Sequence, residues 1–420
     1  MRRWLNKRGS GMTEKQDKTR GRPLRIFVIA GEHSGDALGA KLMAALTTKF
    51  SSAVLFAGVG AEEMAHEGLV SIFSMADIAV MGPFRILRHL PRIVSRVYQT
   101  VDAALAFKPD VVVIIDSPEF THPIAKRIRK RAPSIPIINY VSPSVWAWRS
   151  GRAKKMRAYV DEVLALLPFE PDAHARLGGP HCTYVGHPLI ERLDEIQGAD
   201  GAGLARRLGI DNKTPVLLVL PGSRSSEVER LIDVFGGTVE RLKQQGLDFA
   251  VVIPAVQHLR AMIADETSSW AVKPHIIDSA TDKFAAMRLA RVALAASGTV
   301  TLELGLAATP MVVAYTIEKF IGPFVRRLLK VKTIVLANLV LGENAFPEFI
   351  QQDCTAENLS AALSPLMTDS PARAAQIEAL SQIPARLHLA QGTPSDAAAQ
   401  VVVDVVEHWN GTVIPGNAQP

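Results

Sequence analysis

The chain has 420 residues, enough for two or three domains with hydrophobic cores. Hydrophobic residues make up 48% and charged residues 21%, which places the chain among globular proteins. Its formal charge is +6, but residues 1–22 alone hold eight Arg and Lys against two acidic residues. The rest of the chain is therefore neutral overall, and no nucleic-acid partner is expected.

The basic segment 1–22 has almost no apolar content, so we expect it to be disordered and not to be a secretion signal. Cys182 and Cys354 lie far apart and in no metal or redox spacing, which suits a reducing cytoplasm. No apolar run is long enough to span a bilayer. We expect a protein that is soluble or lies on a membrane surface.

The segment 23–190 alternates short apolar runs with helical patterns. This rhythm predicts a parallel sheet covered by helices on both faces, which is a Rossmann-like α/β domain. Strands are expected at residues 26–30, 54–57, 111–115, 135–141 and 163–167, and helices at 37–47, 121–131 and 152–159.

The first strand ends in a compact loop with the sequence AGEHSGD at residues 30–36. Its two glycines leave room for a ligand, but it lacks the G-x-G-x-x-G spacing of a dinucleotide site, so no NAD is expected. Glu32 and His33 are candidates for substrate contact. Ser34 and Asp36 are more simply interpreted as helix caps.

The segment 81–97 is basic and amphipathic, with Met81, Phe84 and Leu87 followed by further apolar residues at helical spacing. Residues 317–332 repeat this composition. Each segment alone is typical of a helix packed on its own domain. Together they suit attachment to an anionic lipid surface, or an entrance for an acyl chain.

Asp116 closes the almost pure Val/Ile strand 111–115. A carboxylate at the end of a central parallel strand lies at the ligand edge of the sheet, where partial burial raises its pKa and suits it to act as a general base. The alternative is a turn aspartate that bonds its own backbone before Pro118.

Two of the five tryptophans, Trp146 and Trp148, precede Arg149 in the sequence SPSVWAWR. Their rings suit stacking on a sugar or lining an acyl groove. Packing between domains is the alternative.

A polar, glycine-rich stretch at 191–212 is expected to be a linker, after which the alternating pattern restarts. Residues 213–375 are therefore expected to form a second Rossmann-like domain, and 376–412 a set of C-terminal helices that pack across the domains. The fold class is α/β with two doubly wound domains. Strands of the second domain are expected near 216–220 and at 249–254, 275–277, 292–295, 311–314 and 333–336.

Two loops of the second domain suit a nucleotide diphosphate. The strand at 216–220 runs into Pro-Gly-Ser-Arg, in which Ser223 and Arg224 offer donors. The strand at 292–295 runs into Ser297, Gly298 and Thr299 at the start of a helix, whose N–H groups favour phosphate. Glu303 lies one turn further on, within reach of sugar hydroxyls. Ordinary helix caps and surface charges are the alternatives.

These motifs together resemble lipid-A-disaccharide synthase. The resemblance covers about residues 24–390 and rests on AGEHSGD (30–36), IDSPEF (115–120), SPSVWAWR (142–149), VGHPL (185–189), LPGSRSSEV (220–228) and SGTVTLELGL (297–306), together with PMVVAY (310–315) and the residues around 338 and 347–351. It implies an inverting glycosyltransferase of the GT-B type. The reaction would join UDP-2,3-diacylglucosamine to 2,3-diacylglucosamine 1-phosphate through a β-1,6 linkage and release UDP.

The resemblance also implies residue roles. Asp116 would be the general base for the acceptor 6-hydroxyl, and Glu32 matches a further active-site position. Arg224, residues 297–299 and Glu303 would bind UDP, and Asn338 and Gln351 match further active-site positions. Arg85 stands where the family usually has Glu, in the acceptor or acyl region.

The family further implies no obligatory metal or redox cofactor. It implies a peripheral protein on the cytoplasmic face of the inner membrane and a homodimer formed by exchange of C-terminal segments. Two other functions fit the same residues. One is a different UDP-sugar enzyme of this fold, either another transferase or a 2-epimerase. The other is a non-catalytic nucleotide-sugar-binding protein at the membrane surface.

Overall fold

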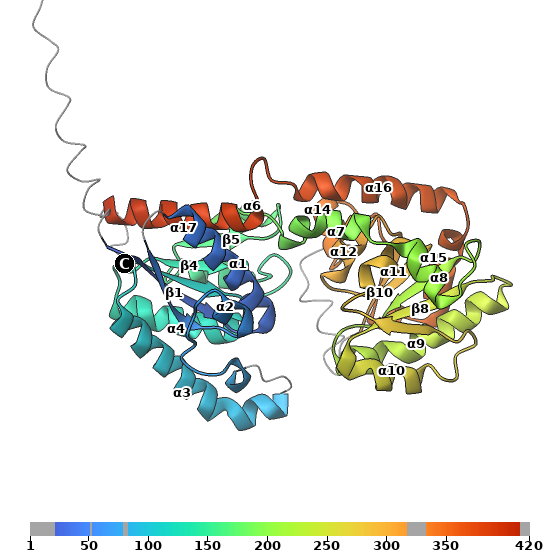
Figure 1. Ribbon diagram of the computed structural model, residues 1–420, viewed down its shortest axis with the longest axis horizontal. Coiled ribbons are helices and arrows are strands. Elements are labelled where there is room, and N and C mark those ends of the chain that lie inside the picture. The colour runs from blue at the N-terminus through green and yellow to red at the C-terminus, as the bar shows by residue number, and fades with distance from the viewer. Residues whose placement is uncertain (1–21, 51–52, 79–82, 317–332, 412–420) are drawn as a thin grey trace, which may run out of the picture.

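The computed structural model describes residues 22–50, 53–78, 83–316 and 333–411, with the helix ends 83–88 and 410–411 described by their backbone alone. Two lobes lie side by side, and each is built on one parallel sheet (Figure 1). The two sheets have six strands each. This confirms the expected α/β class with two doubly wound units. The expectations for residues 1–21 and for the segment 317–332 lie outside the described residues.

The first sheet has the order β2-β1-β3-β4-β5-β6. Its strands are β1 (Leu24–Ala30), β2 (Val54–Val59), β3 (Val111–Ile115), β4 (Ile137–Tyr140), β5 (Glu162–Ala165) and β6 (His181–Tyr184). Alternate residues of the strands enter two cores, one on each face of the sheet. The covering helices are α1 (His33–Lys49), α2 (Glu62–His66), α3 (Pro83–Phe107), α4 (Pro118–Arg131), α5 (Gly151–Met156) and α6 (Glu170–Arg176).

The second sheet has the order β12-β11-β10-β7-β8-β9. Its strands are β7 (Val216–Leu220), β8 (Ala250–Ala255), β9 (His275–Asp278), β10 (Val292–Ala296), β11 (Met311–Tyr315) and β12 (Glu348–Ile350). The helices around it are α7 (Leu193–Gly198), α8 (Gly201–Leu208), α9 (Ser225–Gln244), α10 (Arg260–Glu266), α11 (Lys283–Leu289), α12 (Val300–Leu306), α14 (Leu336–Leu341), α15 (Ala356–Met367) and α16 (Pro371–Leu387). The described chain ends in α17 (Pro394–Gly411).

Three segments differ from their sequence expectation. The expected strand at 333–336 is wrong, because helix α14 begins at Leu336 and the sixth strand is β12. The side chain of Asn338 exchanges two hydrogen bonds of 2.9 Å with the backbone of Phe346, which folds the chain back after α14. The stretch 191–212, expected to be a linker, contains α7 and α8, whose apolar residues enter the core of the second lobe. β6 was not anticipated, because its four residues contain no continuous apolar run.

The chain passes between the lobes twice, at adjacent places. It first crosses from β6 through the 3-10 helix Pro188–Arg192 into α7, and it returns from α16 into α17. The hydroxyl of Tyr184 donates to the carbonyl of Leu387 at 2.8 Å, and Glu191 accepts hydrogen bonds from the backbone N–H and hydroxyl of Ser395. α17 then packs along α1 of the first lobe (Figure 1).

The described part of the chain contains no helix that is both long enough and apolar enough to cross a bilayer.

Candidate active site between the two lobes

Glu32 and Asp116 lie together at the carboxyl edge of the first sheet. β1 is flanked by β2 on one side and by β3 on the other, so the chain reverses its direction of winding between β1 and β3. Ligands of open parallel sheets bind at such a reversal. Glu32 follows β1 and Asp116 follows β3, which places both carboxylates at this point.

The two loops that hold these carboxylates are in direct contact. A Cβ atom at Gly31 would lie 2.3 Å from the Cβ of Ser117, so only glycine allows this approach. Asp116 and Ser117 have φ values of 51° and 42°, in the left-handed region that non-glycine residues rarely occupy. Strained backbone of this kind is concentrated at functional sites.

The Asp116 carboxyl is poised for proton transfer near neutral pH. Burial raises its pKa to about 6, assisted by the hydrogen bond to Glu32 and by the negative charges of Glu32 and Glu119. The Ser117 N–H donates to Asp116 at 2.8 Å and opposes this shift. Glu32 also accepts a hydrogen bond from the Ser34 hydroxyl at 2.9 Å. A general base works best with a pKa close to the working pH.

Asp36 has a structural role. Its buried carboxylate accepts hydrogen bonds from the backbone N–H groups of Ala61, Glu63 and Met64, which open α2. Asp36 therefore caps α2. The sequence indicated a helix cap at this position, but the capped helix is α2 and not α1, in which Asp36 lies.

The second sheet repeats this geometry. β7 is flanked by β8 and β10, so its reversal lies between β7 and β10. The loop after β7 holds Ser223 and Arg224, and the loop after β10 holds residues 297–299. The sequence-predicted diphosphate residues therefore converge on the ligand edge of the second sheet.

Arg224 is already paired in this structure. Its guanidinium donates to Glu227 at 2.8 Å, and the same carboxylate accepts from the Ser223 N–H at 3.1 Å. Gly222 has φ 125°, and a Cβ there would lie 2.6 Å from the Glu227 side chain. Glu227 thus fixes the conformation of the loop. The sequence did not predict this role, because a Glu in the first turn of a helix such as α9 is common.

Glu303 projects from the first turn of α12 and pairs with Lys283 of α11 at 2.8 Å. Its side chain is largely buried. One carboxylate oxygen is engaged by the lysine, which leaves the other to accept from a ligand hydroxyl. Lys283 was missed because it lies twenty residues before Glu303, in a helix without a loop motif.

Gln351 and Thr316 follow the paired ends of β12 and β11. The amide nitrogen of Gln351 and the hydroxyl of Thr316 are buried and have no hydrogen-bond partner among the described residues. Buried polar groups without partners are rare and often mark a place where a ligand binds. Asn338, in contrast, is fully buried and its amide is used by Phe346 and Thr333, so the structure gives it a role in holding the loop.

The two tryptophans differ in their surroundings. Trp146 packs edge-on against Phe169 and donates to the Glu170 carboxylate at 3.1 Å, at the border with the core of the second lobe. It therefore holds the lobes together, the alternative that the sequence left open. Trp148 is exposed, and Arg149 stacks on its ring at 4.3 Å.

Both carboxyl edges face the junction of the lobes. Trp146 follows β4 and Leu167 follows β5, and both contact the core cluster of the second lobe. From the other side, α12 packs on the 3-10 helix Pro188–Arg192, which leaves the first lobe. The loops after β4 and β5 at the carboxyl edge of the first sheet, and helix α12, which carries Glu303, therefore border the junction of the lobes.

The residues expected to contact lipid are only partly described. Met81 lies outside the described residues, and for Phe84, Arg85 and Leu87 only the helical backbone of α3 is described. Further along α3, three large apolar side chains are exposed at helical spacing: Leu90 (46%), Val94 (43%) and Tyr98 (50%).

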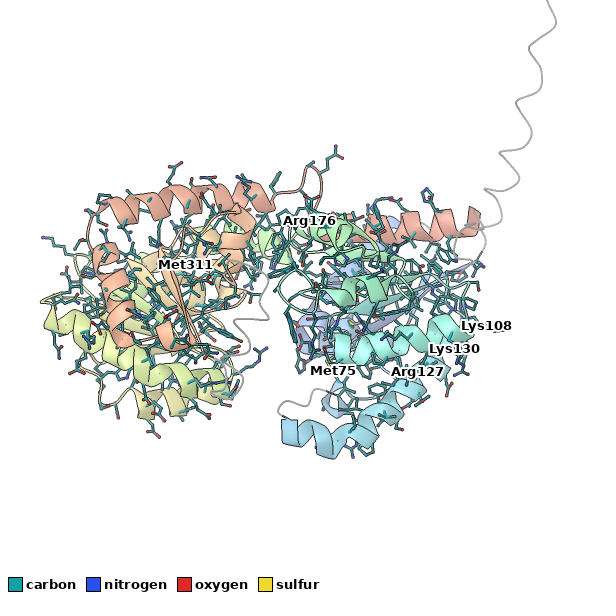
Figure 2. All side chains as sticks on the ribbon, turned by 180° about the vertical axis from the view of Figure 1, so that it is seen from behind. Met75, Lys108, Arg127, Lys130, Arg176 and Met311 are labelled. Atoms are coloured by element: carbon teal, nitrogen blue, oxygen red, sulfur yellow. The ribbon has the colours of Figure 1, made fainter. Side chains whose placement is uncertain are left out.

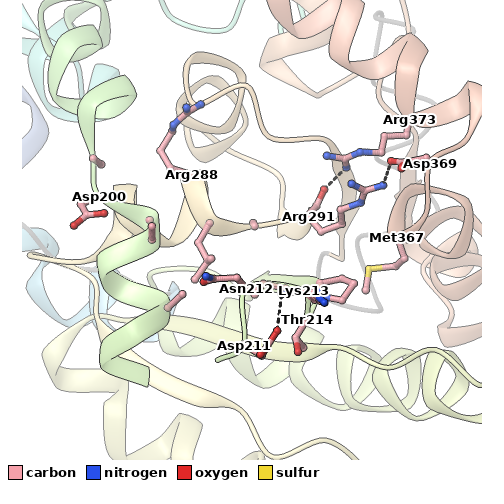
Figure 3. Close-up of a pocket in the computed structure, with 18 of the residues that line it drawn as sticks. Asp200, Asp211, Asn212, Lys213, Thr214, Arg288, Arg291, Met367, Asp369 and Arg373 are labelled. Carbon is pink, nitrogen blue, oxygen red and sulfur yellow. Dashed lines mark hydrogen bonds and ion pairs between the residues drawn. The ribbon is translucent and has the colours of Figure 1, made fainter. Parts of the chain in front are cut away.

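A large cavity lies away from this site. It has a volume of about 1050 Å³ and is lined by Asp200, Asp211, Arg288, Arg291 and Arg373, among others (Figure 3). Residues before β7 and β10 line it, so it opens at the amino ends of these strands. Arg291 and Asp369, which both line it, form an ion pair. Within the described ranges, no three His, Cys, Asp or Glu side chains are grouped as a metal site requires.

Comparison with known proteins decides the family. The family model described as lipid-A-disaccharide synthetase matches residues 26–402. The lipid-A-disaccharide synthase of Rhodopseudomonas palustris is 49% identical over 391 residues, covering 92% of this chain and 98% of that protein. The chain belongs to the lipid-A-disaccharide synthase family. The enzyme of the same name from Nitrobacter winogradskyi is 48% identical, over 91% of this chain and 96% of its own length.

Family membership confirms the expected enzyme class, a glycosyltransferase of lipid A biosynthesis. Solved structures confirm the fold alone. A UDP-GlcNAc 2-epimerase from Neisseria meningitidis bound to UDP-GlcNAc has a TM-score of 0.59 at 14% identity, covering 92% of this chain and all of that one. MurG from Acinetobacter baumannii has a TM-score of 0.55 at 15% identity, covering 92% of this chain and all of that one.

Proposed function

We propose that this chain transfers 2,3-diacylglucosamine from UDP to the 6-hydroxyl of 2,3-diacylglucosamine 1-phosphate. The products are a β-1,6-linked disaccharide 1-phosphate and UDP. The observation that supports this reaction most directly is the Asp116–Glu32 pair at the carboxyl edge of the first sheet.

In this proposal the acceptor hydroxyl attacks the anomeric carbon of the donor while Asp116 accepts the hydroxyl proton. The new C–O bond forms as the bond to the UDP oxygen breaks, and the configuration inverts. Glu32 raises the basicity of Asp116, because its charge repels the deprotonated carboxylate and its oxygen accepts a hydrogen bond from the protonated one. The leaving diphosphate keeps the electron pair of the broken bond.

The donor site is proposed at the β7 and β10 loops. Arg224 would exchange Glu227 for the diphosphate, which makes better use of its forked donors. The Ser297 N–H donates to the carbonyl of Ala314, so the backbone N–H groups of Gly298 and Thr299 would face the phosphates, and Glu303 would accept from ribose hydroxyls. The Gln351 amide and the Thr316 hydroxyl, which have no hydrogen-bond partner among the described residues, would supply further polar groups for the same ligand. Developing negative charge on UDP is then stabilised by preorganised donors.

The decisive experiment mixes purified protein with the two acylated substrates and follows UDP release together with disaccharide formation. Equal amounts of both products support the proposal. UDP release without disaccharide, or epimerised UDP-sugar in its place, would overturn it.

We also propose attachment to the inner face of the inner membrane and a homodimer. The exposed apolar row Leu90, Val94 and Tyr98 on α3 supports attachment to a lipid surface, and the adjacent Arg92 and Arg96 carry two positive charges against the one carboxylate of Asp77 that both contact. α17 is joined to α16 by a short segment and packs on another lobe, which is the arrangement that permits exchange between two copies. Light scattering at twice the chain mass would support the dimer, and the mass of a single chain would refute it.

A further inference from the structure

A second, strongly basic groove opens beside the Asp116 loop. It has a volume of about 470 Å³ and lies between α4 and α5. Four cationic side chains and a single carboxylate line it, so its charge is positive: Lys126, Arg149, Arg152, Lys155 and Glu119. The groove therefore has the electrostatic character of a site for a multiply charged anion.

The cationic groups converge instead of pointing to solvent separately. Arg149 and Arg152 both approach the same oxygen of Glu119, at 3.5 and 2.8 Å. The Lys126 ammonium lies over the ring of Tyr159, 5.0 Å from its centroid, and that ring lines the groove. Lys155 has no ion pair with any residue in the described ranges.

The remaining walls of the groove are fixed and neutral. His122 is buried between the Tyr159 hydroxyl at 3.1 Å and the Asn139 side chain at 3.2 Å. Burial, together with the positive charges of Arg152 and Lys126, lowers its pKa to about 4, against the opposing hydrogen bond with Asn139. The imidazole is therefore uncharged at neutral pH, and the arginine and lysine side chains are the source of the positive charge.

Glu119 connects this groove to the reacting groups. It lies three residues after Asp116, and its charge contributes to the raised pKa of Asp116. Its own pKa is lowered on balance, because the hydrogen bond from Arg152 and the charges of Arg152 and Arg149 outweigh the effect of burial. The Glu119 and Arg149 side chains are largely exposed, so their ion pair costs little to open.

We propose that this groove binds the phosphomonoester of the acceptor sugar, with Lys126, Arg149, Arg152 and Lys155 as its ligands. The assignment rests on the proposed glycosyl transfer. In the acceptor, one sugar ring separates the phosphate from the 6-hydroxyl. A phosphate held at the mouth of the groove therefore presents that hydroxyl toward Asp116. The phosphate replaces Glu119 as the partner of the two guanidinium groups, which bind phosphate through paired N–H donors.

The groove also gives a reason why the acceptor and not the donor is bound here. The donor diphosphate is bridged to uridine and needs the long surface of the second lobe. A terminal phosphate is compact and doubly charged, and it matches a small basic groove. Selection of the acceptor by its phosphate would keep a second donor molecule out of the acceptor position.

The test uses Lys155→Ala and Lys126→Ala, with Lys154→Ala and Lys130→Ala as controls on the same two helices. Lys154 and Lys130 do not line the groove, and Figure 2 labels Lys130 further along α4. Each groove variant should raise KM for the phosphorylated acceptor about tenfold, the equivalent of one charge-assisted contact. The KM for the UDP donor and the turnover at saturation should not change, and the controls should match the parent protein.

A second acceptor, 2,3-diacylglucosamine without the phosphate, separates the two sources of a phosphate group. Groove variants should act on this acceptor as the parent protein does. An equal loss with both acceptors would overturn the proposal. A loss that appears only when substrates are presented in anionic vesicles, and not in neutral detergent micelles, would assign the groove to lipid headgroups and also overturn it.

If the parent protein shows no turnover, a direct binding measurement tests whether the groove binds phosphate. Glucosamine 1-phosphate should bind the parent protein more tightly than glucosamine, and Lys126→Ala and Lys155→Ala should remove that difference. Equal binding of the two sugars by the parent protein would refute the groove, whereas absent turnover with intact phosphate binding would refute only the transfer reaction.

Discussion

At the scale of single residues, the site is organised by pairs of charges. Asp116 has Glu32, Glu303 has Lys283, and Arg224 has Glu227. The sequence motifs predicted one member of each of the last two pairs and both members of the first. Lys283 escaped prediction because it lies on a neighbouring helix, and only the fold brings it next to Glu303.

Replacing Asp116 by Asn tests the general base. The amide keeps the size of the side chain but cannot accept the proton, so kcat should fall by about 100-fold to 10,000-fold. UDP affinity should be retained, because the proposed donor site is in the other lobe. Calorimetric titration with UDP and a turnover assay measure the two quantities, and near-normal turnover would remove Asp116 from this role.

The pKa of Asp116 also sets a pH dependence. The base is active when deprotonated, so activity should decrease as the pH falls through about 6, by about tenfold per unit below it. Glu32→Gln removes the neighbouring charge and should move this limb to lower pH. A profile of kcat against pH for both proteins checks the shift, and an unchanged midpoint would contradict the coupling.

Glu170 is a structural carboxylate at the border of the lobes. One oxygen accepts from Trp146 and the other from the N–H groups of Leu166 and Leu167. Glu170→Gln places an NH₂ group against a donor and leaves at least one buried donor unpaired. We expect a loss of about 1–3 kcal/mol in the free energy of unfolding.

Urea unfolding of Glu170→Gln measures this loss, with the exposed Glu266→Gln as the matched control. If the two variants have the same midpoint, the carboxylate does not contribute to stability.

At the scale of elements, the expected strands and helices were mostly confirmed where apolar runs are long and bounded by loop residues. β3 and β7 are continuous Val, Ile and Leu runs, and both lie within one residue of their expected bounds. The segment 333–336 was misassigned, because a short apolar run fits a strand and a helix equally well. There the choice depends on Asn338 and Phe346, which meet only in the folded chain.

The exposed row on α3 should bind membranes. Leu90→Ser combined with Val94→Ser removes two apolar side chains and should weaken binding to anionic vesicles about tenfold or more. Ile377→Ser is the control, because Ile377 is equally exposed (44%) but lies on α16 of the other lobe. Vesicle sedimentation measures both, and equal binding by the two variants would count against the α3 surface.

At the scale of the whole molecule, α17 is part of the first lobe although it ends the described chain. Ala398, Ala399 and Val402 are fully buried against the core that α1 and β1 supply. The sequence predicted helices here, but it could not predict which lobe they cover, since an Ala-rich helix packs on many surfaces.

Ending the chain at residue 391 should destabilise the first lobe selectively. Without α17, the core of the first lobe loses several apolar contacts. The melting temperature of the first lobe should therefore fall by about 10 °C, while that of the second lobe stays the same. Scanning calorimetry resolves the two transitions, with a chain ending at residue 411 as the control. A shared, unchanged transition would show that α17 contributes nothing to the first lobe.

The paired crossings at Tyr184–Leu387 and Glu191–Ser395 limit how the enzyme can move. Two chain segments that are hydrogen-bonded to each other form a hinge between the lobes. This hinge allows the lobes to open and close, but it resists twisting or sliding of one lobe against the other. Each catalytic cycle would then widen the side away from the hinge most. The diacylated sugars would enter and leave on that side, without any rearrangement inside either lobe.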